Sequence, residues 1–115
     1  AAMRADMIAN LRALRDAGAT LAAGSDTYGE TSSAEIDFLR GLDLFTDAEL
    51  LRMWSTDCAQ TLFPERRLGR LAPGYEASFL VLGGDPLADF TATRDIRMCV
   101  KQGVTLNVPP APAAN

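Results

Sequence analysis

The first two dozen residues predict a helix followed by a strand. Apolar side chains recur at helical spacing, at Met3, Met7, Ile8, Leu11 and Leu14. Gly18 follows as a helix C-cap, and residues 19–24 form a short apolar run without alternation, which is typical of a parallel strand covered on both faces. Asp26 comes directly after this run. The pattern therefore predicts a carboxylate at the C-terminal end of a parallel β unit, where barrels and open α/β sheets bind ligands.

Two capping-box patterns predict two further helices. Residues 32–35 read Ser-Ser-Ala-Glu and predict a helix that turns Ile36, Leu39 and Leu42 inward, with Glu35 as part of its cap. Residues 46–49 read Thr-Asp-Ala-Glu and predict a second helix that runs to about residue 60. An apolar stripe lies along that helix, at Leu50, Met53, Trp54, Cys58 and Leu62.

From residue 67 onward the pattern changes to short strands and tight turns. Turn clusters at 72–75 and 83–86 flank the apolar run 79–82, which predicts a buried strand. Residues 96–101 and 104–108 predict two more strands, joined by a hairpin turn at Gln102-Gly103. The proline-rich tail 109–115 cannot join the interior of a sheet.

Composition and charge exclude some classes of protein. The net charge is -4 and no basic patch with interleaved aromatic residues is present, so we expect no nucleic-acid partner. No apolar stretch approaches the roughly 20 residues of a membrane span, so we expect no membrane partner. Cys58 and Cys99 form no CxxC pattern and are interpreted as buried small hydrophobic residues. Together these features favour a cytoplasmic protein.

Local sequence leaves two interpretations of Asp26 open. An aspartate after a strand is either a ligand-binding group or a residue that caps a turn, and local sequence alone favours the cap. Tyr28 and Glu30 lie in the loop after it and either contact a substrate or belong to an exposed turn. The 115 residues include no histidine, the nitrogen ligand that catalytic zinc sites use most.

The order of motifs along the chain resembles the amidohydrolase superfamily, and more narrowly the C-terminal part of its imidazolonepropionase and prolidase-like branch. The first motif is Gly24-Ser25-Asp26, where threonine is commoner than serine in the family. The other segments that carry the resemblance are residues 10–11, 16–19, 46–50, 55–56, 68–74, 79–87 and 96–103. One departure is Ser78, where the family has an aspartate that serves its small sheet domain.

The resemblance implies an α/β fold, the C-terminal portion of a (β/α)8 TIM-like barrel together with strands of a small β-sandwich. Residues 1–63 would form the last β/α unit or units of the barrel, 64–108 the sandwich strands and 109–115 the tail. In the family such a barrel holds one or two divalent metal ions, commonly zinc, through histidines, a bridging carboxylated lysine or glutamate, and an aspartate after the eighth strand. Asp26 matches that aspartate, and the other ligands have no counterpart here.

These implications define the expected function. The chain would be the C-terminal segment of a metal-dependent hydrolase that cleaves a C–N bond in an amide, a cyclic amide or a dipeptide, with Asp26 as metal ligand and proton shuttle. Its histidine ligands would come from a missing N-terminal part or from a partner chain, and the protein could form a homo-oligomer. The chain alone would be inactive and would bind no catalytic metal. The alternative is a non-catalytic structural remnant of the fold, in which Asp26 only caps a turn.

Overall fold

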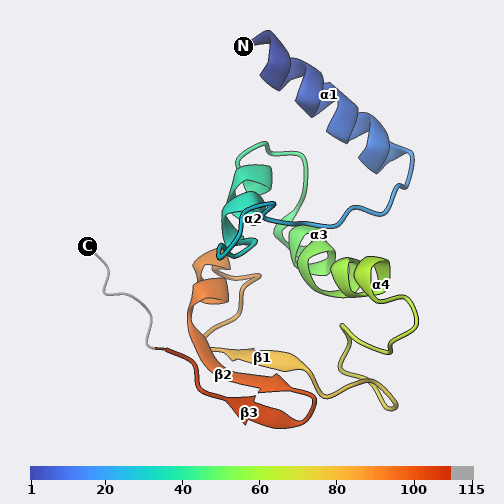
Figure 1. Cartoon of the computed structure of the whole chain (residues 1–115). Helices are drawn as coiled ribbons and strands as arrows, with labels where there is room; N and C mark the ends of the chain where they lie inside the picture. The colour runs from blue at the N-terminus through green and yellow to red at the C-terminus, as the bar shows by residue number, and fades with distance from the viewer. Residues whose placement is uncertain (110–115) are drawn as a thin grey trace.

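The computed structural model describes residues 1–109 of the chain, with helices in the first half and a small sheet in the second (Figure 1). The predicted tail lies, from residue 110 on, outside the described residues. In chain order the elements are α1 (Ala2–Asp16), α2 (Ser33–Arg40), α3 (Asp47–Arg52), the π-helical turn η1 (Met53–Asp57), α4 (Cys58–Leu62), β1 (Phe79–Leu82), the 3-10 turn η2 (Phe90–Arg94), β2 (Ile96–Lys101) and β3 (Val104–Leu106).

The predicted first helix is confirmed, and Gly18 ends it. Gly18 has a φ of +76°, a left-handed conformation that glycine adopts without strain. Its N–H donates to the carbonyl of Arg15, and the N–H of Ala19 donates to that of Leu14, both at 3.0 Å. This pair of hydrogen bonds is the Schellman motif, which closes a helix C-terminus. The guanidinium of Arg15 also donates to the carbonyl of Leu44 and so ties the end of α1 to the segment before α3.

The predicted strand at residues 19–24 is wrong. This segment runs without regular structure, and only Leu21 and Ala23 within it are half-buried. A parallel strand needs a neighbour that accepts and donates its backbone hydrogen bonds. Among the described residues the strands pair only with one another, in the order β1-β2-β3, and all pairs are antiparallel. Residues 19–24 therefore form an extended segment that packs only Leu21 and Ala23 against the helical core.

The apolar core lies between α2 and α3. Ile36 and Leu50 are completely buried, one from each helix. The same cluster includes Leu39, Leu42, Leu44, Met53 and Phe90. The predicted inward stripe of the first of these helices is confirmed. Because Phe90 belongs to η2, the core also receives a side chain from the second half of the chain.

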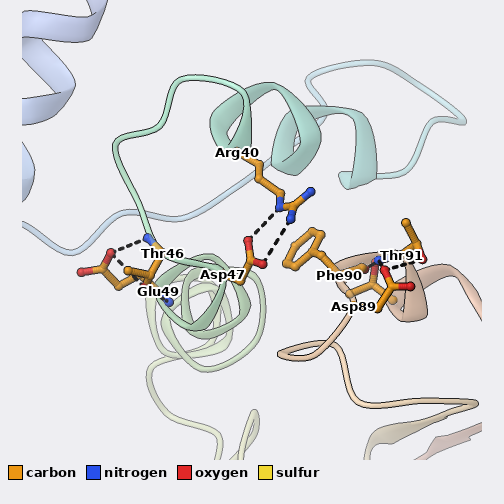
Figure 2. Close-up of polar contacts among 8 residues, drawn as sticks. Arg40, Thr46, Asp47, Glu49, Asp89, Phe90 and Thr91 are labelled. Atoms are coloured by element: carbon orange, nitrogen blue, oxygen red, sulfur yellow. Dashed lines mark hydrogen bonds and ion pairs between the residues drawn. The ribbon is translucent and has the colours of Figure 1, made fainter.

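Of the two predicted capping boxes, one is confirmed and the other is wrong. The Thr46 hydroxyl accepts from the N–H of Glu49 at 3.2 Å, and the Glu49 carboxylate accepts from the N–H of Thr46 at 2.8 Å (Figure 2). Ser32 precedes α2 but caps it with no side-chain bond. Its hydroxyl instead accepts from the indole N–H of Trp54 at 2.6 Å, a tertiary contact that replaces the local one. Glu35 makes no cap bond either.

The second predicted helix continues through a π-helical turn. η1 joins α3 to α4, so the helix ends at Leu62. Met53 is buried, whereas Leu62 at the end of the predicted apolar stripe is 64% exposed. A π-helical turn holds more residues than an α-helical one, so the last turn is rotated away from the core. The prediction of an inward Leu62 is therefore wrong.

A glycine allows the chain to pass close to this helix where it turns back. Gly69 has a φ of +92°, and a Cβ built there would lie 2.7 Å from the Cβ of Ala59 and 3.2 Å from the carbonyl of Ser55. Its own carbonyl accepts from the hydroxyl of Thr56 at 2.9 Å. This junction needs both the left-handed conformation and the missing side chain.

The sheet confirms the predicted strands and their turn. Gln102 and Gly103 have φ of +52° and +77°, two successive left-handed residues as in the type I′ turn of a two-residue hairpin. β3 ends at Leu106, short of the predicted residue 108. The prediction that the first strand is buried is wrong, since Leu80 and Val81 are 52% and 42% exposed. Within residues 1–109 one three-stranded sheet is present.

A charged cluster ties the sheet side of the chain to the helices. Arg40 of α2 bonds both carboxylate oxygens of Asp47, at 2.7 and 3.2 Å, and lies over the ring of Phe90, 4.8 Å from its centroid (Figure 2). The hydrogen bonds that Arg40 donates to the Asp47 carboxylate raise the pKa of Arg40. Arg94 of η2 forms an ion pair with Asp37 of α2. Cation–π contact and ion pairs thus fix η2 on one side of α2.

The described residues leave large apolar surfaces uncovered. The radius of gyration is 15.5 Å, whereas a compact domain of this length has about 13 Å. Large side chains that remain exposed include Met3, Leu14, Leu71, Leu80, Leu87, Met98, Val104 and Leu106. Within residues 1–109 no helix has both the length and the apolar character that a membrane crossing requires.

We expect Gly69→Ala to lower the free energy of unfolding by about 2 kcal/mol or more, because the new Cβ adds strain at a positive φ to a clash with Ala59. Urea unfolding followed by circular dichroism measures the change. Gly41→Ala is the matched control, since Gly41 has a φ of -68° and its nearest contacts are at 3.5 Å. Equal losses in the two variants would contradict the role given to Gly69.

Glu76, which lies shortly before β1, is the centre of a polar network that reaches the turn between β2 and β3. Its carboxylate accepts from Arg66 at 2.6 Å and from the hydroxyl of Ser78 at 2.7 Å. The Ser78 hydroxyl in turn accepts from the N–H of Gln102 at 3.0 Å. Ser78, at the position where the family has an acid, thus joins the hairpin turn to Glu76. Arg66, followed by Ser78, lowers the pKa of Glu76.

A lowered pKa in the folded state predicts a loss of stability in acid. Glu76 stabilises the fold above its unfolded pKa of about 4.5, and this contribution disappears as the pH falls through the lower folded value. We expect Glu76→Gln to flatten the fall in unfolding free energy between about pH 5 and pH 3. Urea midpoints across that range measure it. Glu65→Gln is the control, because the Glu65 carboxylate has no hydrogen-bond or ion-pair partner among residues 1–109, and a wild-type slope in Glu76→Gln would refute the prediction.

Candidate functional site

Asp26 lies on an exposed loop that leads from the extended segment to α2. It has a φ of +50°, one of three positive values among the non-glycine residues described. Left-handed backbone is strained for most residues and is tolerated best by asparagine and aspartate among those with a side chain. The strand that was predicted to deliver Asp26 is absent, yet the residue still stands at the start of a loop.

The turn around Asp26 is held by its neighbours. The hydroxyl of Ser25 donates to the carbonyl of Thr27 at 3.2 Å and accepts from the N–H of Thr27 at 3.4 Å. The hydroxyl of Thr27 donates to the carbonyl of Ser25 at 3.1 Å. No donor among residues 1–109 bonds the carboxylate of Asp26. The alternative in which Asp26 caps a turn therefore has no supporting bond, and its carboxylate is open to a ligand.

Tyr28 and Glu30 follow Asp26 on the same loop. The N–H of Glu30 donates to the carbonyl of Thr27 at 3.3 Å, and Gly29 between them has a φ of +78°, so the loop makes a tight turn. Tyr28 is 106% exposed, and Glu30 is exposed as well. Both side chains lie on the solvent side of the loop, and their contact with a substrate stays a prediction.

Two side chains of the helix opposite anchor the ends of this loop, and sequence reasoning missed them. The thiol of Cys58 accepts from the N–H of Ala23 at 3.2 Å and faces the carbonyl of the same residue at 3.4 Å. Trp54 bonds Ser32 at the other end, as described above. Both anchors belong to the predicted apolar stripe, which marked them as packing residues without indicating their polar contacts. Cys58 and Cys99 are half-buried, so the prediction that both are buried is wrong.

The residues present fit one ligand of a metal site and no more. Asp26 offers an oxygen donor that is exposed and unbonded among the described residues. Residues 1–109 contain no group of three histidine, cysteine or acidic side chains that could hold a metal ion. A catalytic zinc site uses about three protein ligands. Asp26 is therefore compatible with the ligand role and cannot hold a metal on its own.

The sequence profile of the amidohydrolase family matches residues 2–106. The chain belongs to this family, which confirms the resemblance read from its motifs. None of the curated proteins matches it.

Solved structures show the same relationship. A candidate prolidase from Bifidobacterium longum superposes with a TM-score of 0.77 at 26% identity, over 95% of this chain and 28% of that one. A prolidase solved in complex with N-methylphosphonate-L-proline gives a TM-score of 0.72 at 25% identity, over 86% and 26% of the two chains. Ochratoxinase of A. niger gives 0.76 at 22% identity, over 90% and 25%, and shows the fold alone.

The chain thus has an amidohydrolase-family hydrolase fold and spans about a quarter of the length of the structures that it matches. The superposition covers nearly the whole chain, including the helices and the sheet, so the arrangement of these parts is that of the family. The mixed α/β prediction is correct at this level.

If the Asp26 carboxylate caps nothing, its removal should affect stability only through backbone strain. We expect Asp26→Ala and Asp43→Ala to lower the unfolding free energy equally, within about 0.5 kcal/mol, because Asp43 is also exposed and has a φ of +54°. Urea unfolding of both variants tests this. An additional loss of about 1 kcal/mol in Asp26→Ala, the size of a lost cap, would restore the capping interpretation.

Proposed function

We propose that this chain is the C-terminal segment of a metal-dependent amidohydrolase that cleaves a C–N bond in an amide, a cyclic amide or a dipeptide. The observation that carries the proposal is Asp26, an exposed carboxylate without a hydrogen-bond donor among the described residues, in a chain that belongs to the amidohydrolase family. The two prolidases among the similar structures favour a dipeptide or a similar small amide as substrate.

The rest of the site is proposed to come from sequence outside this chain. With no histidine in its 115 residues, the nitrogen ligands must belong to an upstream part of the same protein or to a partner chain. The uncovered apolar side chains of α1 and of the sheet support such a neighbour, because water-exposed apolar surface of this extent marks an interface. In this arrangement residues 1–63 form the last part of a (β/α)8 barrel whose strands come from sequence outside this chain.

The proposed chemistry uses the two properties of a carboxylate, coordination and proton transfer. A divalent metal held in part by Asp26, zinc by preference, would supply a lowered pKa for the attacking water. Asp26 would contribute one ligand oxygen, and its carboxylate would accept the proton of the water that attacks the carbonyl carbon. It would return that proton to the nitrogen of the leaving amine as the C–N bond breaks. Tyr28 and Glu30, two and four residues after Asp26 on the same loop, are proposed to contact the substrate.

We expect Asp26→Asn to lower kcat by roughly 10²- to 10⁴-fold in the full-length protein that carries this chain, because asparagine cannot accept the proton. The assay uses purified protein loaded with zinc or manganese and a panel of proline dipeptides, N-acyl amino acids and cyclic amides. Asp43→Asn is the matched control, with the same left-handed backbone and exposure on another loop. We expect no turnover from the isolated 115-residue chain.

Each result decides a different part of the proposal. Full activity in Asp26→Asn would remove Asp26 from the mechanism. Absence of hydrolysis by the wild-type protein on the whole panel, with either metal, would refute the amidohydrolase activity itself. Turnover by the isolated chain would show that no further ligands are needed.

A further inference from the structure

The loop that carries Asp26 is attached at both ends to one turn of one helix. At its start, Ala23 meets the thiol of Cys58 with both its N–H and its carbonyl, at 3.2 and 3.4 Å. At its end, Ser32 accepts from the indole N–H of Trp54 at 2.6 Å. Trp54 and Cys58 are four residues apart, a spacing that places side chains on the same helix face.

These contacts take the place of a strand pairing. Residues 19–24 have no partner strand among the described residues, so the backbone groups of Ala23 depend on a side chain for their hydrogen bonds. The indole of Trp54 is half-buried, and its N–H needs an acceptor that only Ser32 supplies within the described chain. The π-helical turn η1 contains Trp54 and ends one residue before Cys58. π-Helical turns inside helices are rare and are frequent at functional sites.

We propose that Trp54 and Cys58 are positioning residues, which hold the Asp26 loop in place by bonding its two ends from this turn. This inference rests on the proposed function of Asp26. It identifies the two side chains that hold the loop on which the Asp26 carboxylate lies. This role requires no contact between either side chain and the substrate. Their effect is to limit the motion of residues 24–31, which, within residues 1–109, otherwise bond only to one another and to Ser33.

Fixing a carboxylate matters because proton transfer and coordination depend on its position. A misplacement of about 1 Å at a reacting group can lower a rate 10²-fold. Asp26 has no hydrogen bond of its own to set its orientation in the described residues. The position of its backbone must therefore come from the anchors at residues 23 and 32.

The test compares three variants of the full-length protein by hydrogen exchange and by steady-state kinetics. Trp54→Phe keeps a ring in the core and removes the N–H, and Cys58→Ala removes the thiol. Ser55→Ala is the matched control, since Ser55 lies on the same turn, is exposed and bonds only the carbonyl of Leu51 in its own helix. Exchange is read from a peptide covering residues 22–33, with peptides of α2 and β2 as a check that the variants are folded.

We expect exchange in this peptide to accelerate by roughly tenfold in Trp54→Phe, the factor that corresponds to one lost hydrogen bond, by at least as much in Cys58→Ala, which loses two weaker bonds, and to stay unchanged in Ser55→Ala. We expect kcat to fall by roughly 10- to 100-fold with KM nearly constant, because a misplaced Asp26 affects the reacting geometry. Cys58→Ser should recover most of the loss, since a hydroxyl can make the same two bonds.

A double-mutant cycle covers the case in which Trp54→Phe disturbs the core. Ser32→Ala removes the acceptor from the loop side, and if the bond is what matters, the double variant exchanges no faster than either single variant. Unchanged exchange in all variants, or faster exchange with an unchanged kcat, would overturn the positioning role. If the wild-type protein hydrolyses nothing, the proposed function fails, and exchange alone then decides whether the two side chains hold the loop.

Discussion

The burial of Ile36 and Leu50 in one apolar cluster is the constraint on which the rest of the structure depends. Each of these side chains contributes about 1.5–3 kcal/mol through its removal from water, and together they fix α2 against α3. The extended segment packs its Leu21 and Ala23 against the same cluster, and η2 inserts Phe90 from the sheet side. The segments that surround Asp26 therefore all pack against the same apolar cluster between α2 and α3.

Sequence patterns predicted the features that local forces decide. Gly18 ended α1, the Thr46 capping box began α3, and Gln102-Gly103 formed the hairpin turn, each because neighbouring residues satisfy the backbone without help from elsewhere. The bounds of β1 and β2 also agree with the patterns, because turn residues flank both strands and each supplies the other's hydrogen-bond partners within the described chain. The family was also readable, since the order and spacing of motifs over residues 2–106 carry more information than any one of them.

Features that depend on a distant partner were predicted poorly. A run of apolar residues at 19–24 indicates burial, but only a neighbouring strand makes it a strand, and the described residues supply none. Ser32 had the local chemistry of a helix cap, but its hydroxyl accepts the N–H of the half-buried Trp54 indole, which is costly to leave unpaired, and gives α2 no side-chain cap. The exposure of Leu80 and Val81 has the same origin, because a sheet face is buried only when another layer covers it.

The two loop aspartates with left-handed backbone show why position alone does not define the site. Asp43 ends the turn that closes α2, where its N–H bonds the carbonyl of Arg40 at 3.2 Å, so the helix end accounts for its conformation. Asp26 follows no helix, and its φ is set by a turn whose ends are anchored on Trp54 and Cys58. Strained backbone that the surroundings maintain is found most often where a side chain must be held for a ligand. An unbonded carboxylate on a loop that is anchored at both ends is compatible with the ligand role proposed for Asp26, whereas the conformation of Asp43 is explained by the end of α2.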